Sequence, residues 1–252
     1  MNSVAPQLSI IVPAYNEEAR LGRTLLRIHE YFGSDPRLAN ALEVIVVDDG
    51  STDGTARIAQ EWARTGEREF RLFSNERNRG KGYSVRRGML EARGRIALFT
   101  DADLSAPVEE SEKLFAALAA GQDIAIGSRA IDRSLISTHQ SIFRETAGII
   151  FNAFVRLFTG LRLHDTQCGF KAFVREPCRI IFEQQRIEGF GFDPEVLFLA
   201  GRHGLRTAEV PVRWSHDPAT KVHVVWDSLL MFGDLIYIRW NWLRGRYPVK
   251  RS

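Results

Sequence analysis

Short apolar runs alternate with segments of helical spacing over the first 130 residues of the chain. The apolar runs at 8–13, 43–47, 70–73, 96–100 and 123–126 predict strands, and 17–32, 52–64, 82–92 and 109–120 predict the helices between them. This alternation favours an α/β fold with a mostly parallel central sheet and helices on both faces. Ligands of such sheets bind beyond the carboxyl ends of the strands, so we expect the functional site at that edge.

The second half of the chain keeps this rhythm less clearly. It contains a predicted strand at 208–214 and two amphipathic segments at 146–163 and 224–243. Neither a linker nor an internal repeat separates the halves, so we predict a single domain over residues 1–252. Charged residues interrupt both amphipathic segments, and neither supplies the ~20 apolar residues of a membrane-spanning helix. Each is expected to pack on the core or to lie flat on a membrane.

Composition excludes several classes of protein. With 44% hydrophobic and 26% charged residues, the chain is neither disordered nor fibrous. Its two cysteines, Cys168 and Cys178, are too few for a disulfide framework, and no Cys/His cluster has zinc spacing. We predict that Cys168 is a small buried residue, because no base is identifiable beside it. No secretory signal precedes the first strand, so a cytoplasmic location is expected.

The C-terminal residues 239–252 form a basic end. They carry five basic side chains and no acidic one, interleaved with Trp240, Trp242 and Tyr247. Such a composition is typical of surfaces that bind RNA or anionic membranes. No nucleic-acid recognition module accompanies the basic end, so we expect a membrane surface as partner and no nucleic acid. The sequence predicts no oligomeric state.

Polar clusters follow three of the predicted strands, at 15–17, at Asp48-Asp49 and at Asp101-Ala102-Asp103. In an extended chain the side chains of Asp101 and Asp103 point the same way. Two such carboxylates repel each other unless a cation lies between them or one is protonated. A divalent ion with few protein ligands, completed by substrate phosphates, is typical of Mg²⁺ or Mn²⁺. The alternative is a hydrated acidic turn.

A glycine-rich loop, Asn78-Arg-Gly-Lys-Gly82, precedes the helix predicted at 82–92. Its glycines let a ligand approach the backbone closely, and Lys81 beside a helix N-terminus favours an anion. The alternative is a basic turn. No Walker loop is present and no G-x-G-x-x-G follows the first strand, which argues against a dinucleotide-dependent dehydrogenase.

Two further segments of the second half carry polar side chains. Arg129, Arg133 and Arg144 lie in a stretch with few acids, and they would bind a second anionic group or form a hydrated surface. The segment from Asp165 to Lys171 places an acid, an amide and a lysine around a glycine, and by itself it predicts a turn.

Together these segments resemble glycosyltransferase family 2, whose members have the Rossmann-like GT-A fold. The resemblance spans roughly residues 8–243. It is carried by Ile11-Val-Pro-Ala-Tyr-Asn-Glu17, Val46-Val-Asp-Asp-Gly-Ser-Thr-Asp53, Asn78-Arg-Gly-Lys-Gly82, Asp101-Ala-Asp103 and Gly127-Ser-Arg129. Asp165-Thr-Gln-Cys-Gly-Phe-Lys171 is similar to the branch that uses polyprenyl phosphates, above all the dolichyl-phosphate β-glucosyltransferases. The resemblance implies a nucleotide-sugar-binding half over about 8–130 and an acceptor-binding, membrane-interface half over about 131–252, with C-terminal amphipathic helices.

The resemblance also implies roles for individual residues. Nucleotide-sugar binding is implied for Pro13, Ala14, Tyr15, Glu17, Asp48, Asp49, Lys81, Asp101, Ala102 and Asp103, with Asp103 and Asp101 as metal ligands. Acceptor binding is implied for Arg129, Arg133, Arg144 and Lys221, whose loop would close over the diphosphate. The implied catalytic residues are Asp103, Arg129, Asp165 and Gln167. Asp165 would act as a base or would position the sugar or an arginine.

The implied reaction is the inverting, metal-dependent transfer of glucose from UDP-glucose to a polyprenyl phosphate. A phosphate acceptor is ionised near neutral pH, so it needs orientation and charge screening more than a base. Three alternatives stay open: transfer of mannose from GDP-mannose, transfer of glucose to a soluble or protein acceptor, and a nucleotide-sugar-binding module without catalysis. Eukaryotic members of this branch usually carry a membrane anchor. We expect none here, and we predict a peripheral protein on the cytoplasmic face of the membrane, docked by 146–163, 224–243 and the basic end.

Overall fold

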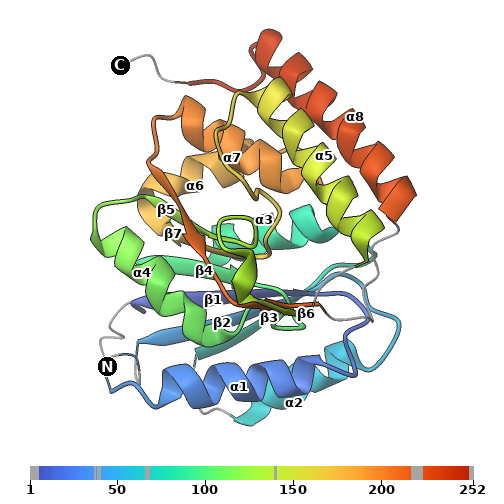
Figure 1. Ribbon diagram of the computed structural model, residues 1–252. Helices are drawn as coiled ribbons and strands as arrows, with labels where there is room; N and C mark the ends of the chain where they lie inside the picture. The colour runs from blue at the N-terminus through green and yellow to red at the C-terminus, as the bar shows by residue number, and fades with distance from the viewer. Residues whose placement is uncertain are drawn as a thin grey trace.

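The computed structural model describes residues 6–36, 38, 41–65, 69–138, 141–216 and 224–249. Its centre is a seven-stranded sheet in the order β3-β2-β1-β4-β7-β5-β8 (Figure 1). These strands are β1 (Leu8–Ala14), β2 (Leu42–Asp48), β3 (Glu69–Ser74), β4 (Ile96–Thr100), β5 (Ile124–Ser128), β7 (Phe170–Val174) and β8 (Thr207–Pro211). Neighbours are parallel except at β7, which runs antiparallel to both β4 and β5. The predicted mostly parallel α/β sheet is confirmed.

Helices cover both faces of this sheet (Figure 1). One face packs against α1 (Leu21–Gly33), α2 (Thr55–Thr65) and α4 (Ser111–Ala119). The other packs against α3 (Lys81–Glu91), α6 (Arg175–Gln184) and α7 (Phe192–Arg202). Because both faces are covered, all of β1 is buried: Ile11 belongs to the core beside α3, and Ile10 and Val12 belong to the core beside α1. The apolar runs of the sequence are therefore continuous rather than alternating.

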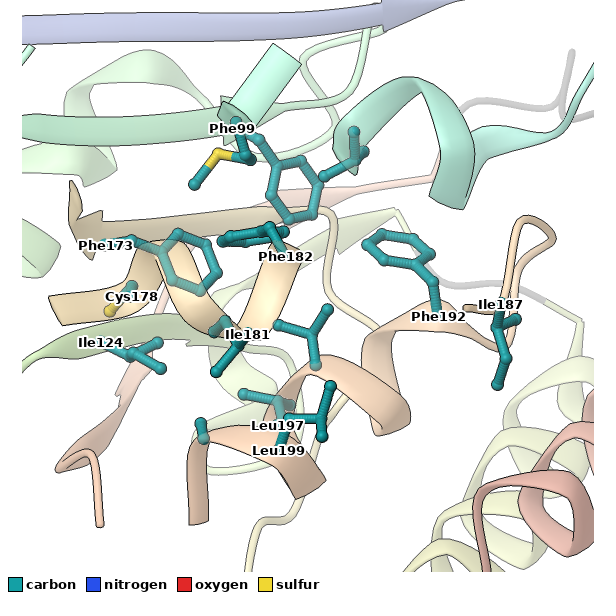
Figure 2. Packing of buried hydrophobic residues seen from close by; sticks show 14 of the residues in the cluster. Phe99, Ile124, Phe173, Cys178, Ile181, Phe182, Ile187, Phe192, Leu197 and Leu199 are labelled. Atoms are coloured by element: carbon teal, nitrogen blue, oxygen red, sulfur yellow. The ribbon is translucent and has the colours of Figure 1, made fainter. Parts of the chain in front are cut away.

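Aromatic rings fill the core between the sheet and the helices α6 and α7. Phe99 on β4 and Phe173 on β7 lie opposite Phe192 and Phe182 (Figure 2). The Phe173 and Phe182 rings meet edge to face with centroids 5.2 Å apart, and the Phe99 and Phe192 centroids are 6.0 Å apart. Since Phe192 begins α7, this packing anchors the loop before it, residues 188–191, at the carboxyl ends of the strands.

Two long helices pack against each other at one end of the molecule: α5 (Ile142–Thr159) and α8 (Val224–Leu243) (Figure 1). The Phe232 ring of α8 meets the rings of Phe154 and Phe158 edge to face, at 5.2 and 5.6 Å. Large apolar side chains of both helices are exposed: Ile149, Ile150, Phe154, Leu157, Leu229, Leu230, Ile236, Tyr237, Trp240 and Leu243. No helix in the described part of the chain is long and apolar enough to cross a membrane.

Two helices begin later than their apolar spacing predicts. The helix expected from residue 17 begins at Leu21, because Glu17 closes a turn: its carbonyl accepts the Arg20 N–H and its carboxylate accepts Arg20 Nε at 2.6 Å. The helix expected from residue 52 begins at Thr55, where the Asp53 carboxylate accepts the Thr55 N–H at 3.0 Å. At Asp53 a side chain competes for a backbone donor of the first helical turn. At Glu17 the backbone carbonyl closes the turn, and the carboxylate binds the Arg20 side chain instead.

The turn expected over 165–171 ends in a strand that was not predicted from the sequence. Phe170 begins β7, which inserts between β4 and β5 and brings the second half of the chain into the same sheet. The lysine at position 171 obscures the apolar pattern of this strand. The other elements are the short strands β6 (Ile136–Thr138) and β9 (Trp214–Ser215), which pair with each other, and the 3-10 turns η1 (Val108–Glu110) and η2 (Arg133–Leu135).

Candidate active site

A cavity of about 320 Å³ opens where β1, β2 and β4 end beside the start of α3, and we call it the strand-end cavity. Its lining residues are Pro13, Ala14, Tyr15, Glu17, Arg20, Asp49, Asn78, Gly80, Lys81, Ser84, Asp101, Ala102, Asp103, Gly189 and Phe190. Every residue predicted to bind a nucleotide sugar is among them except Asp48. The Asp48 carboxylate is buried and accepts the Ser51 N–H at 3.1 Å.

Asp101 and Asp103 follow β4 in a tight turn. The Leu104 N–H donates to the carbonyl of Asp101 at 3.2 Å, and Leu104 has a φ of 49°, in the left-handed region that leucine rarely adopts. The Ser105 N–H then donates to Asp103 Oδ1 at 2.9 Å. Burial and repulsion by Asp101 both raise the pKa of Asp103. The two carboxylates of this turn therefore repel each other, and a cation bound between them would relieve that repulsion.

This pair of carboxylates fits a hard divalent cation that has few protein ligands. In the described residues, no three or more His, Cys, Asp or Glu side chains gather to form a complete metal cage. Asp101 and Asp103 would hold the ion, and water and substrate phosphates would supply the remaining oxygens. Mg²⁺ and Mn²⁺ are commonly bound in this way.

Lys81 already supplies a positive charge to this pair. It is the first residue of α3, and its Nζ lies 2.5 Å from Asp101 Oδ1. Burial lowers the pKa of Lys81, but the attraction of Asp101 and Asp193 outweighs that effect and raises the pKa above its usual value. The ammonium therefore stays charged at neutral pH.

The glycine-rich loop that carries Lys81 is held from two sides. Asp49 accepts the backbone N–H groups of Arg79 and Gly80 at 3.0 and 2.8 Å, so this predicted ligand residue also braces the loop. Gly80 has a φ of 105°, and a Cβ there would collide with the carbonyl oxygen of Glu188. Glycine is required at position 80 by both its conformation and its contact.

A second cavity, of about 120 Å³, contains all of the predicted residues of the acceptor side that the structure describes, and we call it the arginine cavity. Its lining residues are Arg129, Ala130, Arg133, Ile136, Arg144, Glu145, Gly148, Ile149, Asn152, His164, Asp165, Thr166, Gln167 and Trp214. Arg133 forms an exposed ion pair with Glu145. Lys221 lies outside the described residues.

Asp165 is saturated by hydrogen bonds and holds Arg129. Its carboxylate accepts the guanidinium of Arg129 at 2.6 and 2.9 Å, and the N–H groups of Arg129 and Gln167 both at 3.0 Å. Burial raises the pKa of Asp165, but the charge and hydrogen bonds of Arg129 outweigh it and lower the pKa to about 2. A carboxylate in this state is a weak base, and its hydrogen bonds hold the Arg129 guanidinium in place.

The segment 165–171 connects the two cavities. Asp165 and Gln167 line the arginine cavity, while Gly169 lies against Asp101 of the strand-end cavity so closely that a Cβ at Gly169 would lie 2.0 Å from Asp101 Oδ2. The Gly169 carbonyl accepts the Asp101 N–H at 3.2 Å. One short segment therefore sets the distance between the acidic pair and the arginines.

Three residues that pack beside the two cavities, Lys171, Asp193 and Glu209, were missed by the sequence analysis or given no role in it. Lys171 on β7 forms a buried ion pair with Asp193 at 2.6 Å, and Asp193 lies in the first turn of α7. Glu209 on β8 accepts the N–H groups of His164 and Asp165 at 2.9 and 2.7 Å. The Trp214 ring lies 5.3 Å from the Arg129 guanidinium. An acidic residue within a predicted strand, as at position 209, was the one available signal.

Comparison with known proteins decides the family. Residues 9–182 match the family described as glycosyl transferase family 2. The chain belongs to glycosyl transferase family 2. The glycosyltransferase is 38% identical to the dolichyl-phosphate β-glucosyltransferase of Drosophila melanogaster over 98% of this chain and 79% of that protein. It is 34% identical to the human dolichyl-phosphate β-glucosyltransferase over 100% of this chain and 80% of that protein.

The fold of the glycosyltransferase also has solved counterparts. The glucosyl-3-phosphoglycerate synthase of Mycobacterium tuberculosis, crystallised with Mn²⁺, UDP and its product, superposes with a TM-score of 0.65 at 22% identity. The match covers 98% of this chain and 82% of that one. The resemblance to family 2 and the predicted GT-A fold are confirmed.

Proposed function

We propose that this glycosyltransferase transfers glucose from UDP-glucose to dolichyl phosphate or a related polyprenyl phosphate, with inversion at the anomeric carbon. The named activity of its relatives in fly and human supports the acceptor and the sugar. The proposal rests on one observation: the segment 165–171 connects the strand-end cavity, which contains Asp101 and Asp103, to the arginine cavity, which is lined by three arginines. A sugar nucleotide and a lipid phosphate are both anionic, so a transferase for this pair needs two such subsites side by side.

The donor would occupy the strand-end cavity. Its base and ribose would lie against Pro13, Ala14 and Tyr15, and its diphosphate would lie toward Lys81 and Asp101, which line the same cavity. A divalent cation on Asp101 and Asp103 would neutralise charge on the departing diphosphate. Lys81 and the N-terminus of α3 add positive potential at the same place.

The acceptor phosphate would occupy the arginine cavity. One of its oxygens attacks the anomeric carbon, the bond from that carbon to the diphosphate breaks, and UDP leaves with the electron pair. Because the phosphate is already ionised, no side chain has to remove a proton. Arg129, held by Asp165 and packed on Trp214, would orient the phosphate and screen its charge. Asp165 acts in this scheme as a positioning residue.

The lipid part of the acceptor points to a membrane surface as the partner. Apolar side chains are exposed along α5 and α8, with Leu157 75% and Leu229 61% exposed, and Ile149 of the same surface also lines the arginine cavity. Arg156, Arg239 and Arg244 are exposed on or beside these helices, which suits an anionic bilayer. We propose that α5 and α8 dock on the membrane. The cytoplasmic face and the division into halves at about residue 130 stay predictions.

A label-transfer assay tests the reaction. Purified protein is mixed with a polyprenyl phosphate, Mg²⁺ or Mn²⁺, and either labelled UDP-glucose or labelled GDP-mannose, and label in the organic phase is counted. We expect transfer from UDP-glucose and a loss of at least about 100-fold in Asp103→Ala. The control Glu61→Ala removes an exposed carboxylate of α2 and should keep full activity. Transfer from GDP-mannose alone, or from neither donor, would refute the proposal.

Vesicle binding tests the docking surface separately. The variants Leu157→Glu and Leu229→Glu each place a charge among the exposed apolar side chains, and we expect at least about tenfold weaker cosedimentation with anionic vesicles. Leu26→Glu is the matched control, because Leu26 is 48% exposed on α1, on the other side of the sheet. If all three variants bind vesicles equally well, α5 and α8 are not the docking surface.

A further inference from the structure

The carboxylate of Asp101, a proposed metal ligand, already forms an ion pair with Lys81. Lys81 Nζ lies 2.5 Å from Asp101 Oδ1, with the two side chains 21% and 31% exposed. This charge-assisted contact occupies one of the two oxygens of a carboxylate that would serve the divalent ion as a ligand. A metal ion and the Lys81 ammonium therefore compete for Asp101.

Lys81 occupies an electrostatically unfavourable position in its helix. Lys81 is the first residue of α3, where the helix dipole disfavours a positive charge. The backbone on either side is confined: Gly80 is pressed against the carbonyl of Glu188, and a Cβ at Gly82 would lie 2.6 Å from Cβ of Phe192. The backbone is thus confined on both sides of Lys81, and from there its side chain reaches Asp101.

We propose that Lys81 is the resident counter-ion of Asp101 and that it keeps the divalent cation out until the anionic donor arrives. In the free protein the cation must displace the ammonium, which costs it affinity. The diphosphate of a bound donor offers Lys81 a new anionic partner in the same cavity and frees Asp101. Metal and donor would then bind with positive coupling that passes through this lysine. The inference rests on the proposed function in taking Asp101 and Asp103 as the metal ligands and in placing a diphosphate donor in the strand-end cavity.

Measurement of Mn²⁺ binding tests the inference without any turnover. Mn²⁺ alone is titrated into wild type, Lys81→Met and Lys81→Arg, followed by electron paramagnetic resonance or calorimetry, with and without UDP. Lys81→Met should bind Mn²⁺ at least about tenfold more tightly than wild type when UDP is absent. UDP should strengthen the Mn²⁺ binding of Lys81→Met by a smaller factor than it does in wild type. Lys81→Arg keeps the charge and should bind Mn²⁺ as weakly as wild type.

The matched control is Lys113→Met, which removes one positive charge from the chain outside the strand-end cavity. Lys113 pairs with Glu110 at 2.6 Å and has a 44% exposed side chain. It should leave the Mn²⁺ affinity unchanged, which separates a local effect from the change in net charge. If Lys81→Met binds Mn²⁺ no more tightly than Lys113→Met, while UDP still promotes Mn²⁺ binding, this inference falls and the proposed function stands. If no variant binds Mn²⁺ with or without UDP, the proposed metal site falls and this inference falls with it.

Discussion

The buried pair of Arg129 and Asp165 allows a quantitative prediction. Asp165→Asn removes the negative charge that neutralises the Arg129 guanidinium, while the shape of the side chain at position 165 is nearly kept. The Asp165 side chain is 8% exposed and that of Arg129 is 28% exposed, so the arginine gains only partial hydration in exchange. We expect the variant to lose stability and to leave Arg129 poorly oriented.

The size of the loss follows from the pKa of Asp165. Lowering that pKa from 3.8 to about 2 corresponds to about 2 kcal/mol of folding free energy at neutral pH. Breaking a fully buried pair costs about 3–5 kcal/mol, and the partial exposure of Arg129 reduces this. We therefore expect Asp165→Asn to lower the free energy of unfolding by about 2–3 kcal/mol at pH 7.

The pH dependence gives this prediction its sharpest test. A carboxyl with a lowered pKa stabilises the fold above its unfolded pKa, and that stabilisation is lost as the pH falls from 3.8 toward about 2. The difference between wild type and variant in urea denaturation should therefore shrink between pH 5 and pH 3. Glu183→Gln, which breaks the exposed pair with Arg179 at 2.9 Å, is the control and should cost under about 0.5 kcal/mol. A loss that is equal at both pH values, or no larger than in the control, would refute the reasoning.

Three other substitutions test the packing around the site. Tyr247→Phe removes the hydroxyl that donates to the buried Glu195 at 2.5 Å, and it should lower the free energy of unfolding in urea by about 1–3 kcal/mol; an unchanged value would contradict the contact. Asp234→Asn replaces a carboxyl whose pKa is raised by burial to about 6. In thermal unfolding at pH 8 the variant should therefore gain stability on the order of 1 kcal/mol, and this gain should disappear below about pH 4. An equal gain in stability at both pH values would count against the prediction. Gly82→Ala places a Cβ 2.6 Å from that of Phe192 and should cost about 1–3 kcal/mol in the same thermal assay, whereas a neutral effect would show that the loop can shift.

The strand-end cavity was predictable because its parts are local in the chain. The apolar runs of β1, β2 and β4 end in polar residues, and parallel strands bring their carboxyl ends to one edge whatever the rest of the fold does. Asp101, Asp103 and Lys81 could therefore be placed together before their distances were known. The helix boundaries were less predictable, since local hydrogen bonds at Glu17 and Asp53 delay the first turns of α1 and α2.

The arginine cavity was predictable in its members but not in their pairing. Arg129 and Asp165 are 36 residues apart, and only the insertion of β7 between β4 and β5 brings them into contact. The same insertion places Lys171 where it can pair with Asp193 of α7. Such pairs depend on which strand lies next to which, and no periodicity in the sequence records that order.

The sequence by itself determined the alternation of strands and helices, the family and the set of polar residues at the strand ends. Hydrophobic period and short motifs are local properties, and they survive in the linear chain. Only the tertiary structure decided that Asp165 is hydrogen-bonded to Arg129, and that Lys81 is paired with Asp101. Burial and the partners across the fold set the charge state and orientation of a side chain, and both arise only when distant segments pack together.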